Sequence, residues 1–126
     1  MREIRYRAKC CHDHHWHEGR PYQNCGTWAM ECTDEGGRLR RVEGETITEW
    51  TGCRDKKGIR IFEGDILEHD DGWLVVVEFI APFWCITKLN GLIARDTLDN
   101  YTSAQSYKVI GNQFDNPELM RRENET

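Results

Sequence analysis

The stretch from Glu49 to Leu67 constrains the fold of this chain more than any other part of the sequence. Two apolar runs, Ile47–Trp50 and Ile59–Phe62, flank a polar turn that carries a glycine near each end, Gly52 and Gly58. Glycine supplies positive φ without a Cβ clash, and the charged residues between the two glycines favour a solvated turn. The stretch therefore predicts a β-hairpin.

Short apolar runs separated by turn residues continue along the rest of the chain. Asp70–Gly72 and Asn90–Gly91 have the composition of tight hairpin turns. This pattern predicts a mainly β fold, a small barrel-like or rolled antiparallel sheet of about seven short strands. Asn116 at the N-cap and Pro117 at the first helical position predict a short C-terminal helix. We expect residues 121–126, which are charged or polar, to fray.

Length and charge restrict the class of protein. The chain has 126 residues, which fits one domain, and its 17 basic and 22 acidic residues give a net charge of −5. This balance argues against non-specific binding to nucleic acid, which needs clustered basic charge. No apolar run approaches the roughly 18 residues that a membrane span requires, so we expect a cytoplasmic protein. In that compartment the six cysteines should remain thiols or bind metal.

The segment from Cys10 to Cys32 differs in composition from the rest of the chain. It holds four of the six cysteines and four of the five histidines, and its apolar residues show neither helical nor strand periodicity. Such a segment cannot order itself through burial alone, so it needs a metal, a partner or tolerance of disorder.

Thiolate and imidazole are the ligands that zinc prefers, and four of them complete a structural site. The predicted ligands are Cys10, His12 or His14, Cys25 and Cys32. Because their spacing matches no standard zinc motif, a polar loop with incidental ligands is the alternative interpretation.

Several short stretches, in order, match a known family. They are Met1–Ala8, Trp50–Gly52, Asp55–Gly58, Ile61–Ile66, Val76–Phe79, Val109–Asn112 and Asn116–Leu119. On these residues the chain resembles the YopX family of phage and prophage proteins. The resemblance implies a single β-rich, barrel-like domain over residues 1–126, with a variable Cys/His-rich insertion at about residues 10–32. It implies no catalytic residues, because the family has no established biochemical activity.

No catalytic motif stands out in the sequence. The chain lacks a P-loop, a Gly-x-Ser-x-Gly elbow and a dinucleotide fingerprint. The carboxylates Glu63, Asp65, Asp70 and Asp71 lie at expected turns, where capping the backbone is their ordinary role. We therefore expect a protein that is not an enzyme.

Two tryptophans in the Cys/His-rich segment are candidates for contact with a partner. Trp16 and Trp28 belong to no predicted core, and tryptophan is an efficient interface anchor. The leading hypothesis is a phage accessory protein that binds a host or phage protein, for example a counter-defence inhibitor, with Arg5 and Arg7 as further contacts.

Two other hypotheses remain open. A nucleic-acid-binding regulator would use the basic stripe of Arg2, Arg5, Arg7 and Lys9, together with a zinc loop. A small-molecule sponge would need a pocket formed between subunits, and a homo-oligomer is compatible with either hypothesis.

Overall fold

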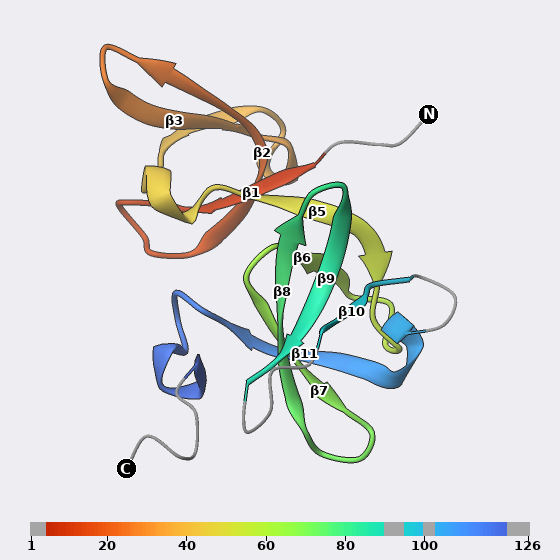
Figure 1. Cartoon of the computed structure of the whole chain (residues 1–126). Helices are drawn as coiled ribbons and strands as arrows, with labels where there is room; N and C mark the ends of the chain where they lie inside the picture. The colour runs from red at the N-terminus through yellow and green to blue at the C-terminus, as the bar shows by residue number, and fades with distance from the viewer. Residues whose placement is uncertain (1–4, 90–94, 100–102, 121–126) are drawn as a thin grey trace. The chain divides into compact units, whose positions relative to one another are not determined.

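The structure is a computed structural model that describes residues 5–89, 95–99 and 103–120, and these residues are mainly β (Figure 1). The strands are β1 Tyr6–Lys9, β2 Trp16–Asn24, β3 Thr27–Cys32, β4 Arg38–Arg41, β5 Thr48–Arg54, β6 Arg60–Phe62, β7 Asp65–His69, β8 Leu74–Ile80, β9 Phe83–Lys88, β10 Arg95–Thr97 and β11 Tyr107–Asn112. Short 3-10 turns are η1 Thr33–Glu35, η2 Gly44–Thr46, η3 Ser103–Ser106 and η4 Pro117–Met120.

Contacts group these elements into two compact units, Met1–Trp50 and Thr51–Thr126. The mainly β class is confirmed, although the described residues form eleven strands where about seven were expected. The prediction of a single domain with an insertion stays a prediction. The expected turn at Asn90–Gly91 and the expected frayed tail, 121–126, lie outside the described residues.

The predicted C-terminal helix is not confirmed. Pro117–Met120 forms a single 3-10 turn, in which the Leu119 N–H donates to the Asn116 carbonyl at 3.0 Å. The Asn116 side chain accepts a hydrogen bond from the Asn112 N–H at 3.2 Å, which ties it back to β11. Within the described residues, Leu119 and Met120 of this turn pack against the buried cluster of Ile66, Val76 and Leu89.

Unit 1 contains an antiparallel sheet in the order β4-β3-β2-β1-β5. Its core is small: four buried residues, with two partly buried neighbours, Tyr6 and Ile47. The buried residues are Ala8, Met30, Cys32 and Val42. Strand β5 crosses the boundary at Trp50, and its second half belongs to unit 2.

The Cys/His-rich segment is ordered as a hairpin of β2 and β3, although its sequence showed no strand periodicity. The buried positions of β2 are occupied by His17 and Gly19. Neither residue is hydrophobic, so the alternation of apolar and polar residues that marks a strand is missing from the sequence. The backbone at Gly19 packs so closely against β3 that a Cβ there would stand 2.1 Å from the Glu31 carbonyl oxygen. Only glycine fits at this position without a shift of the backbone. Cys25 and Gly26 form the two-residue turn with φ of 52° and 82°, the combination that a type I′ hairpin requires.

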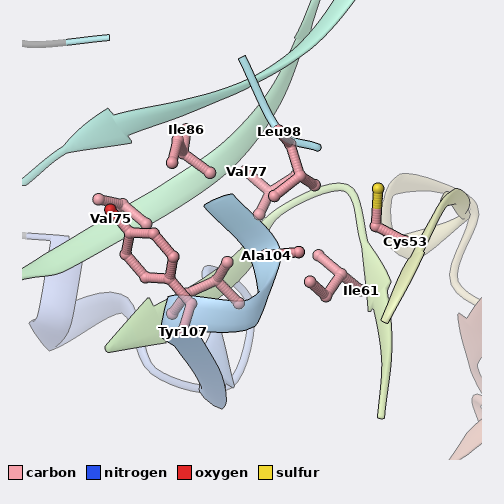
Figure 2. Close-up of a cluster of buried hydrophobic side chains, with 9 residues drawn as sticks. Cys53, Ile61, Val75, Val77, Ile86, Leu98, Ala104 and Tyr107 are labelled. Atoms are coloured by element: carbon pink, nitrogen blue, oxygen red, sulfur yellow. The ribbon is translucent and has the colours of Figure 1, made fainter. Parts of the chain in front are cut away.

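Unit 2 contains an antiparallel sheet in the order β10-β9-β8-β7-β11. One face carries the larger core of the protein, to which β5, β6 and η3 also contribute (Figure 2). Its buried residues are Cys53, Ile61, Leu67, Val75, Val77, Ile86, Leu98, Ala104 and Tyr107. Trp73, just before β8, and Trp84, in β9, pack against this cluster as partly buried neighbours.

The predicted hairpin turns at Gly52–Gly58 and Asp70–Gly72 are confirmed. The first joins β5 to β6 with Gly58 in the turn at φ of 81°, whereas Gly52, at φ of 89°, lies within β5, so the turn is shorter than expected. The second joins β7 to β8, with the Gly72 N–H bonded to the His69 carbonyl at 2.8 Å. The capping role expected of Asp65 is also present, because its Oδ2 accepts a hydrogen bond from the Phe62 N–H at 2.8 Å.

Candidate functional site

A cluster of ionisable side chains surrounds His17 in unit 1. His17 is buried, and its two ring nitrogens face different carboxylates. Nε2 lies 3.1 Å from Asp13 Oδ2, while Nδ1 lies 3.2 Å from Asp34 Oδ2 and 3.4 Å from Glu35 Oε1. An imidazole placed in this way can accept a proton or bind a metal through one nitrogen while the other donates a hydrogen bond.

Local turns bring the carboxylates to His17. Asp13 lies in the loop between β1 and β2, where its Oδ1 accepts a hydrogen bond from the His15 N–H at 2.8 Å. Asp34 and Glu35 lie on η1, which follows β3 directly. Gly36, at φ of 69°, ends this turn in the left-handed region. Because β2 pairs with β3, η1 is held beside the start of β2.

Arg40 connects the two sides of the cluster. Its Nη2 donates to Glu35 Oε2 at 2.9 Å, its Nη1 lies 3.2 Å from Asp13 Oδ2, and the same Nη1 lies 3.7 Å from Cys10 Sγ. The hydrogen bond from Arg40 lowers the pKa of Glu35 below its usual range. The backbone hydrogen bond from His15, together with His17, lowers the pKa of Asp13. Both carboxylates are therefore ionised at neutral pH.

Two buried thiols border the cluster. Cys10 and Cys32 are almost fully buried, and burial raises the pKa of Cys32 to about 11, so this group is a protonated thiol at neutral pH unless a cation displaces the proton. One ligand atom from each of His17, Cys32, Asp34 and Glu35 lies within 4.8 Å of the others, and the same holds for Cys10, Asp13 and His17.

A second feature of unit 1 is an open groove of about 540 Å³. Its lining residues are Tyr6, Gly19, Arg20, Pro21, Trp28 and Ile47. Trp28 is 37% exposed, and its indole lies against Gly44, where a Cβ would stand 2.3 Å from Cδ1. The groove is thus largely aromatic and aliphatic, with one cationic residue at Arg20.

The comparisons with known proteins bear on nearly the whole chain. The family model described as "YopX protein" matches residues 5–121. The chain belongs to the YopX family. This YopX-family chain is also similar to a solved structure titled "Crystal structure of protein EF1440 from Enterococcus faecalis", with a TM-score of 0.51 and 20% identity over 96% of this chain and 100% of that chain. That likeness shows a shared fold. The search of curated proteins found no match.

The structure of this YopX-family protein brings together only part of the predicted zinc set. Cys10 and Cys32 border the His17 cluster, whereas Cys25 is exposed at the tip of the β2–β3 hairpin. His12 and His14 are exposed and belong to neither group of ligand atoms found among the described residues. His17 was absent from the predicted set, and its four-residue spacing from Asp13 was the available signal.

The structure places the predicted partner-contact residues at different sites. Trp28 lines the groove, but Trp16 does not, and the Trp16 ring lies under the Arg7 guanidinium at 4.7 Å. Arg5 pairs with Glu18 at 3.6 Å, so a carboxylate partly offsets the basic stripe. Within the described residues, no helix of this YopX-family chain is long and apolar enough to cross a membrane.

Proposed function

We propose that this YopX-family chain is a non-catalytic accessory protein that binds a protein partner through the groove around Trp28. The observation that carries the proposal is an exposed tryptophan beside an apolar groove in a chain whose other tryptophans are half-buried. Exposed apolar surface of this kind is typical of contact sites, and tryptophan is enriched among residues that dominate binding energy.

The chemistry of the groove favours a protein over a nucleic acid. Tyr6, Pro21, Trp28 and Ile47 offer apolar surface, and Arg20 is the cationic residue of the lining. A phosphate backbone would require clustered basic charge, but the chain is acidic overall and Arg5 is paired with Glu18. The phage resemblance in the sequence supports a host or phage protein as the partner. A counter-defence inhibitor in the host cytoplasm is the specific role we propose.

The test is a quantitative binding comparison after affinity capture from host cells producing the tagged protein. Trp28→Ala should weaken the captured complex by about 2 kcal/mol, roughly thirtyfold, and leave the thermal melt close to that of the wild type. Tyr22→Ala is the matched control, because Tyr22 is 39% exposed on the same hairpin and does not line the groove.

Arg5→Ala combined with Arg7→Ala separates the protein partner from nucleic acid. This double variant should affect a protein complex less than Trp28→Ala does. Retention on a DNA column that falls steeply with salt and requires these arginines would support the nucleic-acid hypothesis instead. Unchanged partner affinity in a folded Trp28→Ala variant would place the contact surface elsewhere.

A further inference from the structure

The ionisable cluster in unit 1 has two features that the ion pairs alone do not explain. Three carboxylates, Asp13, Asp34 and Glu35, lie around one buried imidazole, whereas Arg40 pairs with two of them, Asp13 and Glu35, and Arg38 also acts electrostatically on Glu35. The immediate surroundings of His17 therefore carry excess negative charge. Beside this charge lies the fully buried thiol of Cys32, whose Sγ lies 3.7 Å from the Met30 carbonyl oxygen, longer than an ordinary hydrogen bond to oxygen.

Unit 1 also has little apolar burial to hold this region in place. Its core contains four buried residues, whereas nine form the main core of unit 2. Small folds with so little core are commonly stabilised by a metal or another cross-link. His17 lies on β2, Cys32 ends β3, and Asp34 and Glu35 lie on η1, so a cation held by these residues would cross-link the start of β2 to the turn after β3.

We propose that His17, Cys32, Asp34 and Glu35 bind a structural zinc ion. One imidazole nitrogen, one sulfur and two carboxylate oxygens within 4.8 Å of one another provide the number and kinds of ligand that a closed tetrahedral site uses. This ligand set differs from the one predicted from the sequence and shares only Cys32 with it. The inference is independent of the function proposed for the groove.

The orientation of His17 assigns a role to each nitrogen. Nδ1 faces Asp34 and Glu35 and is the nitrogen available to the metal, whereas Nε2 faces Asp13. The Nε2–H would then donate to the Asp13 carboxylate, the usual way in which a ligand histidine is oriented. Arg40 fixes the Glu35 carboxylate by donating through Nε to Oε1 and through Nη2 to Oε2. On binding, the Cys32 thiol releases its proton to solvent, so that the sulfur coordinates as a thiolate.

The experiment uses the full chain, expressed with zinc in the medium and purified without chelator. Metal analysis should find close to one equivalent of zinc, and chelation should lower the melting temperature, because metal-binding energy becomes folding energy. Cys32→Ser, His17→Gln and Asp34→Ala should each reduce the zinc content to under about a tenth of an equivalent under the same dialysis. Asp13→Asn should keep the site but weaken zinc affinity by about 10- to 100-fold.

Matched controls come from the ligands that the structure places elsewhere. Cys25→Ser and His12→Gln should retain the full equivalent of zinc, since both side chains are exposed and outside the cluster. Asp34 is 41% exposed, so Asp34→Ala keeps the test valid if the variants at buried positions do not fold.

Three results would overturn the proposal. The first is less than a tenth of an equivalent in the wild type after incubation with zinc. The second is zinc retained at wild-type affinity in Asp34→Ala and Cys32→Ser. The third is zinc lost in Cys25→Ser, which would assign the metal to the ligands predicted from the sequence.

Discussion

The carboxylate of Asp55 accepts a hydrogen bond from the backbone N–H of Val109 at 2.9 Å, across 54 residues of sequence. The other oxygen of the same carboxylate accepts from the N–H groups of Lys57 and Ile59 at 2.8 and 2.9 Å. One buried side chain thus closes the β5–β6 hairpin and attaches it to β11. Asp55 therefore stabilises its own turn and also makes a tertiary hydrogen bond to a distant strand.

Replacing Asp55 should destabilise unit 2 strongly. Asp55 is 2% exposed, so Asp55→Ala leaves backbone donors without their carboxylate in a buried site. A hydrogen bond to a charged group contributes about 1.5–3 kcal/mol, and we expect a loss of about 3 kcal/mol or more in the free energy of unfolding. Urea denaturation measures it. Asp71→Ala is the control, because the Asp71 side chain is 73% exposed and should change stability little. Equal effects of the two variants would contradict this role.

Gly44→Ala should impair binding in the groove, although Gly44 is not one of the residues that line it. The new Cβ would lie 2.3 Å from Trp28 Cδ1, so the indole must move away. A half-exposed side chain can shift while the strands remain, so we expect a near-normal thermal melt and an affinity between those of the wild type and Trp28→Ala. Titration calorimetry with the captured partner measures this. Glu45→Ala, an exposed neighbour on η2, should bind normally. A wild-type affinity for Gly44→Ala would contradict the role of the indole.

Part of the stability of unit 2 should disappear in acid. The hydrogen bond from Lys56 lowers the pKa of Asp70, so the folded state favours the ionised carboxylate. This contribution is present above the pKa of the unfolded chain, about 3.9, and is lost as pH falls through the lower folded pKa. Wild type and Asp70→Asn should therefore differ in urea midpoint at pH 7 and converge as the pH falls below the folded-state pKa of Asp70. The difference should be small, because the pair is solvent-exposed. A difference that grows in acid would contradict the assignment.

The cysteines should divide into two reactivity classes. Cys11 and Cys25 are exposed, whereas Cys10 and Cys32 are buried, and burial raises the pKa of Cys32 to about 11. Because the thiolate is the reactive form, alkylation at pH 8 in the metal-free protein should modify Cys25 quickly and Cys32 only after unfolding. Peptide mass spectrometry reports each site separately. Modification of Cys32 at the rate of Cys25 in folded protein would show that unit 1 opens readily.

Local turn chemistry was readable from the sequence, because it depends on neighbouring residues. Gly58 and Gly72 adopt the positive φ that their turns require, and Asp65 caps the backbone as expected. The family also followed from short stretches in the right order. The extra strands were not readable, because β2 places His17 and Gly19 at its inward positions, where a search for apolar alternation finds nothing.

By itself, the sequence determined the mainly β class, the central hairpin and the family. It also marked residues 10–32 as chemically distinctive, because composition and turn preference are local properties. The tertiary structure alone decided which of these residues meet. Strand pairing of Gly19 with Cys32 brings His17 beside η1, while the Cys25–Gly26 turn carries Cys25 to the hairpin tip. Register joins residues that are distant in the sequence, so spacing along the chain could not identify the ligand set.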